Sequence, residues 1–268
     1  MEVLKDLRLA VLIDADNVPY SQVQAMLQEI AKYGTPTFKR IYADWTKPTV
    51  SGWKTKLLEH AITPVQQYSY TTGKNSSDSA LIIDAMDILY TGRVDGFCIV
   101  SSDSDFTRLA TRLREAGMKV FGIGEKKTPL AFISACDKFI YIEILKGNGE
   151  NKKKPQASTA RKKSPQKRAK EEPVETANAA DSMDNINWEL VNLIETSIND
   201  LADESGWVFL GDLGNLLLKK KPDFDPRNFG FKKLVSLIES LNQFEVNKES
   251  SGKGNISHVY VRNKQLAS

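Results

Sequence analysis

Four aspartates in the first half of the chain have the side-chain type and spacing of a site that handles phosphates: Asp14, Asp78, Asp103 and Asp105. Like charges about 4 Å apart repel each other by about 4 kcal/mol at an effective dielectric constant of 20. Carboxylates that converge therefore raise their own pKa values or bind a cation. Oxygen ligands alone suit a hard ion, Mg²⁺ or Mn²⁺, which activates water for attack on a phosphodiester. The four aspartates predict a metal site, provided that the fold brings them together.

Asp14 follows a short apolar segment, residues 9–13, that has no polar alternation. Such a run is typical of a strand buried on both faces in a parallel sheet. Polar residues that end a buried strand lie at its carboxyl end, where open α/β sheets place their ligands. Asp14 is therefore a candidate ligand, and Asn17 a candidate that orients a ligand or the scissile phosphate. For Asp16 and Asn17, capping of the helix that begins at Pro19 is the alternative interpretation.

Asp78 lies at the start of a predicted helix, residues 78–90, on the same side as the apolar residues of that helix. N-capping of the helix is the alternative to a role as metal ligand. Asp84 falls at the flank of the apolar face, where it is expected to support the site, whereas Asp87 is expected to face solvent. The apolar face consists of Leu81, Ile82, Ala85, Ile88 and Leu89.

Asp103 and Asp105 lie in the sequence SSDSDF, residues 101–106, where a predicted strand ends and a predicted helix begins. One acid here would be an ordinary helix cap, but two acids placed opposite Asp14 favour a site. Strands that alternate with helices predict β-α-β units and a parallel sheet. Because right-handed crossovers place the carboxyl ends of parallel strands at one edge, Asp14 and Asp103 are expected to meet there.

The remaining hydrophobic pattern of residues 1–146 agrees with this α/β prediction. In the helix predicted over residues 50–60, Trp53, Leu57 and Leu58 are expected to face the core. Strands are predicted at residues 9–13, 38–43, 61–66, 96–101, 119–123 and 138–142. Helices are predicted at residues 19–33, 50–60, 78–90, 105–116 and 129–136.

Composition argues against several classes of protein. No apolar stretch approaches the roughly 20 residues needed to span a bilayer, and the first residues lack the apolar centre of a signal peptide, which predicts a cytoplasmic protein without membrane contact. Cys98 and Cys136 lie in apolar surroundings and are expected to be small core residues. With only two histidines in the chain, neither a zinc site nor a Ser-His-Asp triad is supported.

Residues 147–184 predict a basic, disordered linker that lacks apolar periodicity. Between residues 146 and 170 the chain carries ten basic residues and one acid, although its net charge is only +3. Positive charge gathered in one segment favours a polyanionic partner such as nucleic acid, and a solubilising linker is the alternative. A linker of this length predicts two domains that act semi-independently. The candidate nucleic-acid contacts in it are Lys152, Lys153, Lys154, Arg161, Lys162 and Lys163.

Residues 185–264 predict a smaller second domain of the winged-helix type. Helical patterns at residues 188–201, 213–217 and 231–241 precede a hairpin formed by residues 244–246 and 259–261. Such modules mostly bind nucleic acid, although some bind only protein. Trp207 is either a base-stacking residue or a core residue, and core packing is the favoured interpretation. The candidate phosphate contacts are Lys219, Lys220, Lys221, Lys232, Lys233 and Arg262.

Three motifs occur in order in the first domain: LIDADN at residues 12–17, Gly73-Lys74-x3-Asp78, and SSDSDF followed by Gly117-x-x-Val120. Together they make residues 7–145 similar to the NYN family, in its LabA-like branch within the PIN-like nuclease fold. The resemblance implies a metal-dependent ribonuclease that uses Mg²⁺ or Mn²⁺. Ser102 stands where the family often has glycine. The matching positions are Asp14, Asn17, Asp78, Asp103 and Asp105, and Lys74 is either a stabiliser of transition-state charge or an exposed loop lysine.

The second domain, from Trp188 through GWVFLGDLGNLL to YVRN, is similar to the OST-HTH (LOTUS) domain. The pairing with an NYN domain is a known architecture, and the resemblance implies RNA binding. The leading hypothesis is therefore a metal-dependent RNA endonuclease in which the second domain and the linker bring RNA to the first.

Two other hypotheses remain open from the sequence. Residues 14–18, DADNV, also fit the start of haloacid-dehalogenase-like phosphatases, with Asp14 as nucleophile and Asp16 as acid. The third hypothesis is an RNA-binding adaptor that does not cut, in which the acids are only helix caps. The oligomeric state is open, including a homo-oligomer.

Overall fold

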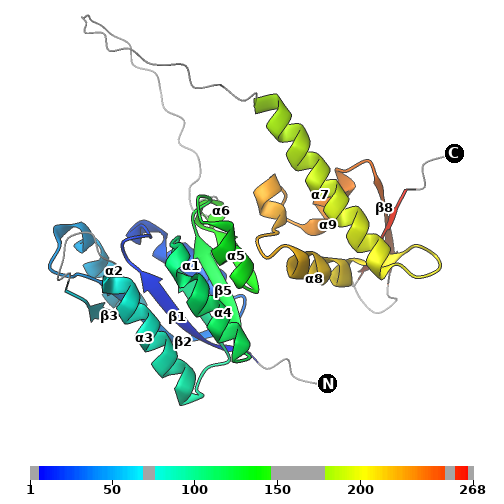
Figure 1. Ribbon diagram of the computed structural model, residues 1–268. Coiled ribbons are helices and arrows are strands. Elements are labelled where there is room, and N and C mark those ends of the chain that lie inside the picture. The colour runs from blue at the N-terminus through cyan, green and yellow to red at the C-terminus, as the bar shows by residue number, and fades with distance from the viewer. Residues whose placement is uncertain (1–5, 69–75, 146–178, 251–256, 265–268) are drawn as a thin grey trace, which may run out of the picture.

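The computed structural model describes residues 6–68, 76–145, 179–250 and 257–264 (Figure 1). Its first domain has a six-stranded sheet in the order β3-β2-β1-β4-β5-β6, and every pair of neighbouring strands is parallel. The predicted parallel α/β fold is thereby confirmed. The strands are β1 (Arg8–Asp14), β2 (Thr35–Ala43), β3 (Thr63–Gln66), β4 (Gly96–Val100), β5 (Lys119–Gly124) and β6 (Lys138–Tyr141).

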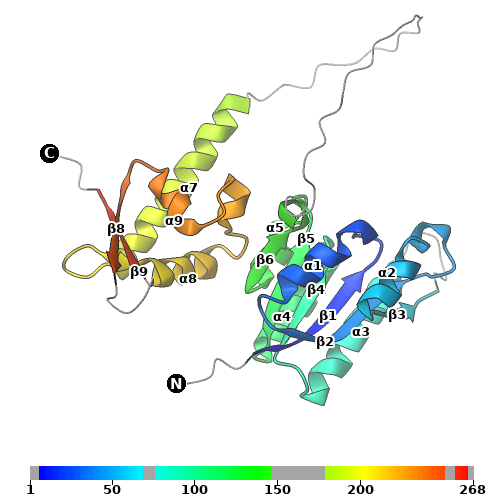
Figure 2. The same ribbon diagram turned by 180° about the vertical axis from the view of Figure 1, so that it is seen from behind.

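Helices cover both faces of this sheet, as the two opposite views show (Figures 1 and 2). One face packs against α1 (Val23–Ile30), α2 (Trp53–His60) and α6 (Ile142–Leu145). The other face packs against α3 (Ser76–Thr91), α4 (Thr107–Glu115) and α5 (Leu130–Ala135). Short 3-10 helices lead into three of these helices: η1 (Tyr20–Gln22), η2 (Pro48–Val50) and η3 (Ser104–Phe106).

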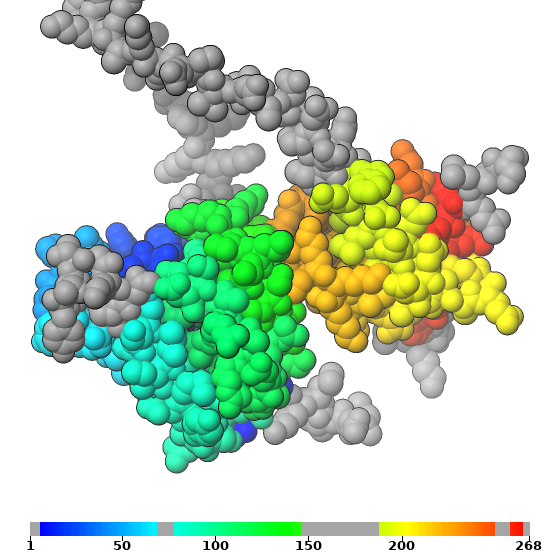
Figure 3. Space-filling model, in the orientation of Figure 1, coloured from blue at the N-terminus to red at the C-terminus, as the bar shows by residue number. Residues whose placement is uncertain are grey.

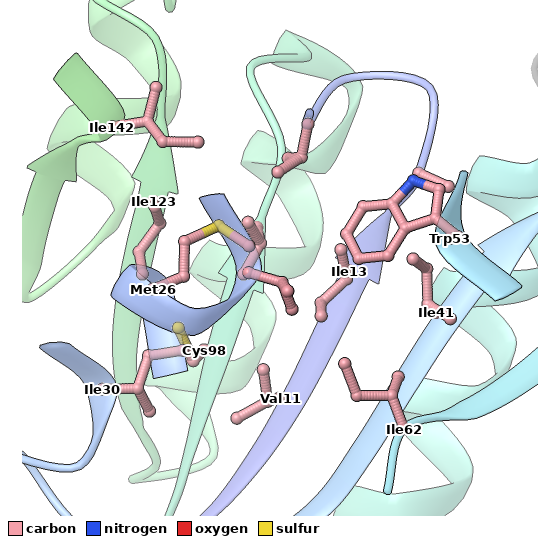
Figure 4. Close-up of a cluster of buried hydrophobic side chains, with 14 of the residues drawn as sticks. Val11, Ile13, Met26, Ile30, Ile41, Trp53, Ile62, Cys98, Ile123 and Ile142 are labelled. Carbon is pink, nitrogen blue, oxygen red and sulfur yellow. The ribbon is translucent and has the colours of Figure 1, made fainter. Parts of the chain in front are cut away.

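Strand β1 has no solvent face because its alternate residues enter two separate cores. Val11 and Ile13 pack beneath α1 and α2, where Met26 and Trp53 meet them (Figure 4). Leu12 enters the second core, beneath α3 and α4. None of these three β1 side chains is more than 1% exposed. The unbroken apolar run that predicted this strand is what a doubly covered parallel strand requires.

The prediction that Leu58 faces the core is wrong. Its side chain is 83% exposed, whereas Leu57 is 9% exposed and Trp53 2%. Trp53 and Leu57 are four residues apart and therefore lie on one face of α2, but Leu58 lies about 100° further round the helix. Leu58 does not belong to any core cluster of the described residues.

The second domain is a winged helix with its own core, which confirms the predicted architecture. Its antiparallel sheet has the order β7-β9-β8. Ile194, Leu213, Ile238 and Val261 are buried at its centre. The third helix is shorter than predicted, and the first begins before residue 185. The elements are α7 (Ala179–Leu201), β7 (Val208–Phe209), α8 (Leu210–Lys220), η5 (Pro226–Phe229), α9 (Leu234–Glu239), β8 (Phe244–Ser250) and β9 (Ser257–Asn263).

Cys98 and Cys136 are free and buried, as predicted. Within the described ranges, no helix combines the length and the apolar character that crossing a bilayer requires.

The adjacent leucines of α2 give a matched test of this packing. Leu57→Ala is expected to lower the free energy of unfolding by about 2–3 kcal/mol, because it removes buried methyl groups and leaves a cavity. Leu58→Ala is expected to change it by less than about 0.5 kcal/mol. Urea unfolding of both variants checks the expectation, and equal losses would contradict the assignment of the two faces.

Candidate active site at the carboxyl edge of the sheet

The strand order creates a topological switch point between β1 and β4. Strands β2 and β3 follow on one side of β1, and β5 and β6 follow on the other side of β4. Open α/β sheets bind ligands in the crevice outside the carboxyl ends of the strands at this point. Ile13 pairs with Val100 in the register of the two strands. Asp14 and Ser101 therefore leave the sheet side by side, as the sequence pattern predicted for the ends of these strands.

Asp14 is held in a network of hydrogen-bond donors rather than left facing solvent. Its side chain is 1% exposed. The Ser101 hydroxyl donates to its carboxylate at 3.0 Å, the Asp16 backbone N–H donates at 3.2 Å, and the Asn17 side-chain amide donates as well. The N-cap of η1 is Pro19, and no side chain caps that helix. The capping interpretation of Asp16 and Asn17 is therefore wrong, because the Asn17 amide is used to orient Asp14.

Three other acids form a cluster beside Asp14. Asp78, Asp103 and Asp105 each offer a carboxylate oxygen, and these oxygens lie within 4.8 Å of one another. Asp78 is buried, Asp103 is half-buried and Asp105 is exposed, so the cluster opens from the core towards solvent. Among the described residues, the ligand atoms of these three acids are close enough to share one ion. Asp14 is not part of this group.

Asp103 both caps a helix and joins the cluster. Its side chain accepts a hydrogen bond from the Asp105 backbone N–H at 2.9 Å, which makes it the N-cap of η3. Its own N–H donates to the Ser101 hydroxyl oxygen at 3.1 Å. Ser101 thereby connects Asp14 to the turn that carries Asp103 and Asp105. The capping and ligand interpretations are compatible here, since the cap uses one oxygen of the carboxylate.

Asp78 reaches the cluster from α3, whose first turn lies at the carboxyl edge. It is the third residue of that helix and is 7% exposed. Helix α3 packs on β1 and β2 through the same face that carries Asp78, with Leu81, Ala85 and Ile88 buried against the sheet. The burial of this apolar stripe therefore brings Asp78 towards the other acids.

Burial and, to a smaller extent, repulsion within the site raise the pKa values of Asp78 and Asp14. Burial raises the pKa of Asp78 to about 7, with further increases from the charges of Asp14, Asp103, Asp105 and, least, Asp16. Burial also raises the pKa of Asp14, against the hydrogen bonds from Asn17 and Ser101. A divalent cation would relieve this repulsion, and a donor set made only of carboxylates suits Mg²⁺ or Mn²⁺. The residues present therefore fit such an ion.

Asp84 anchors α3 to the sheet, less than two turns beyond Asp78. The Arg40 guanidinium and the Tyr42 hydroxyl, both from β2, donate hydrogen bonds to its carboxylate. Arg40 and Tyr42 were not identified from the sequence, although the flanking position of Asp84 was a signal that it supports the site. Asp87 is exposed, as predicted.

The two serines of the SSDSDF motif have structural tasks that the sequence did not reveal. Ser101 is fully buried between Asp14 and the Asp103 turn. Ser102, the departure from the glycine of the family, is 7% exposed and accepts a hydrogen bond from the Glu125 backbone N–H at 2.9 Å. The hydroxyl therefore ties this turn to the loop after β5. The feature of the sequence that could have indicated this role is a small polar residue at the end of a buried strand.

The predicted nucleic-acid contacts divide into two groups. Lys232 and Lys233 are exposed on the second domain. Trp207 is half-buried, and the Arg262 guanidinium lies over its ring at 4.6 Å from the centroid. The interpretation that Trp207 packs in the core is therefore wrong, because its ring is part of a surface stack. Lys74, Lys152, Lys153, Lys154, Arg161, Lys162 and Lys163 lie outside the described residues.

An open parallel sheet with acids at its switch point, followed by a winged helix, defines a PIN-like α/β domain joined to a nucleic-acid-binding type of module. The model of the NYN domain matches residues 8–143, which is half of the chain, and the chain belongs to this family. The model of the OST-HTH/LOTUS domain matches residues 184–256. A nuclease-type hydrolase domain and an RNA-binding type of domain are thus combined in one protein, as the motifs predicted.

Two solved structures are similar to parts of this chain. A protein of unknown function from Vibrio parahaemolyticus is 22% identical, with 53% of this chain and 96% of that chain covered and a TM-score of 0.44. An uncharacterized protein from Nitrosomonas europaea is 25% identical, with 41% and 96% covered and a TM-score of 0.26. A match among curated proteins was not found.

The raised pKa of Asp78 gives the metal-free protein a pH-dependent stability. Between pH 3.8 and about 7 the folded state keeps a proton that the unfolded chain has lost. The free energy of unfolding is therefore expected to fall as the pH rises through this window, by on the order of 4 kcal/mol. Asp78→Asn is expected to reduce this pH dependence, and Asp87→Asn to preserve it. Urea unfolding in EDTA at several pH values measures the slope, and an unchanged slope in Asp78→Asn would contradict the assignment.

The anchoring role of Asp84 predicts a difference between two aspartates on the same helix. Asp84→Ala is expected to lower the free energy of unfolding by about 1–3 kcal/mol, because Tyr42 and Arg40 lose their acceptor. Asp87→Ala, at an exposed position with the same change in helix propensity, is expected to cost nothing measurable. Thermal unfolding compares the two variants, and similar transition temperatures would argue against the anchor.

Proposed function

We propose that this protein is a Mg²⁺- or Mn²⁺-dependent ribonuclease that cuts RNA internally. The observation that carries the proposal is the convergence of Asp78, Asp103 and Asp105 within 4.8 Å at the switch point of a NYN domain. The OST-HTH/LOTUS domain in the same chain supports RNA as the substrate. Phosphodiester hydrolysis is the reaction that an acidic, metal-binding edge of a sheet serves best.

In this proposal the three clustered acids hold the cation and Asp14 supports them. A bound divalent ion supplies Lewis-acid activation of water and neutralises charge on the phosphate. Asp14 is the fourth acid of the site: it adds its negative charge at Asp78, and Asn17 and Ser101 keep its carboxylate in a fixed orientation. Asp105, the exposed member, lies where water and a phosphate group enter.

The protonation state of Asp78 would depend on whether a cation is bound. A carboxyl group whose pKa lies near neutrality is suited to take a proton from an attacking water or to give one to a leaving oxygen. Asp78 has a pKa of about 7 in the metal-free protein, and a nearby cation would lower it. Asp78 would then hold the cation as a carboxylate, together with Asp103 and Asp105.

The second domain is proposed to bind the RNA strand. Lys232 and Lys233 are exposed and suit phosphate contacts, while the Arg262–Trp207 stack offers a cationic and aromatic surface for a base. The proposal adds RNA contacts from Lys74 and from the basic residues of 147–184, as the sequence predicts.

The test is an incubation of the purified full chain with labelled single-stranded RNA, with Mn²⁺, with Mg²⁺ or with EDTA. Cleavage is expected only with metal, and Asp103→Asn is expected to slow it by about 100-fold or more. Asp87→Asn, an exposed aspartate outside the site, is the matched control and is expected to cut normally. Binding of RNA without cleavage, unchanged in Asp103→Asn, would favour the adaptor hypothesis instead.

A further substitution separates the nuclease from the phosphatase hypothesis. Asp16 is exposed and lies outside the acidic cluster, so Asp16→Asn is expected to keep most RNA cleavage activity. In a haloacid-dehalogenase-like phosphatase the same residue would be the general acid, and its loss would abolish hydrolysis of a phosphate monoester such as p-nitrophenyl phosphate.

A further inference from the structure

The second domain lies against one edge of the first through a short segment, residues 222–227, that precedes and enters η5. Figures 1 and 2 place this part of the second domain beside β6 and α5, and in Figure 3 the two surfaces meet. Strand β6 is the last strand of the sheet, so this contact covers an edge. The prediction of semi-independent domains did not include any such contact.

Arg227 is the centre of the contact. Its two terminal nitrogens donate to the two carboxylate oxygens of Glu29 in α1, at 2.9 and 2.8 Å. The same guanidinium donates to both oxygens of Asp225, its neighbour in the second domain, at 2.9 and 2.7 Å. Bidentate pairing of arginine with carboxylates is the strongest common form of charge-assisted hydrogen bond, and it fixes the orientation of both partners.

The carboxylates in this contact are removed from water. Glu29 is 3% exposed and Asp225 is 6% exposed. Burial pushes the pKa of Glu29 upward, but hydrogen bonds from Arg227 and Lys32 outweigh it and bring the pKa down to about 2. Without the second domain, the side-chain partners that Glu29 would keep among the described residues are Lys32 and Tyr33. A glutamate that is this well buried is therefore explained by a partner 198 positions away in the sequence.

Two further hydrogen bonds extend the contact along β6. The backbone N–H of Phe139 donates to the Pro222 carbonyl at 2.9 Å, which satisfies a donor on the open edge of the sheet. The Tyr141 hydroxyl donates to Asp223 at 2.7 Å. Tyr141 is the last residue of β6, so the second domain contacts this strand near the carboxyl edge at which the acids lie.

Charges on the two sides of the contact are complementary. The first domain contributes Glu29 and Lys138, and the second contributes Arg227 and Asp225. The Asp225 charge raises the pKa of Lys138, although burial, the larger effect, lowers it overall. Because residues 146–178 tether the domains covalently, even a small complementary surface is favoured by a high effective concentration.

We propose that residues 222–227 are a docking element that holds the RNA-binding type of domain on α1 and β6 of the NYN domain, with the Arg227–Glu29 pair as its lock. The two domains then form one unit in solution, and the second domain keeps a fixed position beside the carboxyl edge of the sheet. This arrangement is independent of whether the protein cuts RNA.

The test measures the distance between spin labels on cysteines introduced by Arg93→Cys and Glu204→Cys in the full chain. Both positions are exposed, and the native Cys98 and Cys136 are buried and so are protected from labelling. A single narrow distance population is expected in the parent protein. Glu29→Gln is expected to replace it with a broad one, because Gln keeps the shape of the side chain but removes the charge that Arg227 needs.

Arg227→Gln is the second variant, and Arg262→Gln is its matched control. Arg262 pairs with Glu245 inside the second domain, so Arg262→Gln is expected to leave the narrow population unchanged. Broadening in both Glu29→Gln and Arg227→Gln, with the circular dichroism spectra unchanged, supports docking. A broad population in the parent, a narrow one in both variants, or broadening in only one of them overturns it.

Hydrogen exchange at the Phe139 amide gives an independent readout at the edge of the sheet. Exchange is expected to accelerate by about tenfold or more in Glu29→Gln, because undocking removes the Pro222 acceptor. Unchanged exchange at this amide would also overturn the proposal.

One consequence rests on the proposed function. If the docked domain presents RNA at a fixed place, the positions of cleavage on a defined RNA are expected to spread in Glu29→Gln while the metal requirement stays the same. An absence of cleavage in every protein would overturn the nuclease, whereas the spin-label distances would still decide docking.

Discussion

The parallel pairing of β1 with β4 is the constraint on which the rest of the structure depends. These two strands lie side by side where the order of the sheet reverses, and their register sets Asp14 next to Ser101. Both strands are apolar and covered on both faces, so a slip by one residue would exchange the contents of two cores. The acids that follow these strands are therefore held together by the burial of hydrophobic residues, and not by any attraction among themselves.

Repulsion among these acids favours the presence of a cation in the site. The apolar stripe of α3 and the Asp84 anchor press Asp78 into the cluster, although its pKa of about 7 shows that a charge there is unfavourable. Relief of that repulsion by a cation is a driving force for metal binding that exists before the ion arrives. The half-buried Asp103 and exposed Asp105 leave the open side of the site to solvent and substrate. In the proposed function, packing energy would thus be converted into affinity for a divalent ion.

The winged-helix domain adds a second level of organisation. It has its own core, formed entirely by residues of the second domain. Its contact with that domain is made by ion pairs and hydrogen bonds around Arg227, and such polar interfaces between domains resemble those of proteins that associate reversibly. The contact lies on β6, which β5 separates from β4 in the sheet. In the proposed function, an RNA strand held by the second domain would reach the acids across the carboxyl ends of β5 and β6.

The sequence by itself determined the strands, the helices and the four acids, because apolar runs such as residues 9–13 and helical stripes such as that of α3 are local patterns. It also determined both families, because LIDADN and SSDSDF in the first domain and GWVFLGDLGNLL in the second are contiguous motifs. Tertiary structure alone decided which acids converge: Asp14 is enclosed by Ser101 and Asn17, and Asp105 joins the cluster. It decided the anchor of Asp84 and the pair between Arg227 and Glu29 as well. These partners come from distant strands and domains. A buried charge needs such a partner, and which charges are buried depends on the packing of the whole chain.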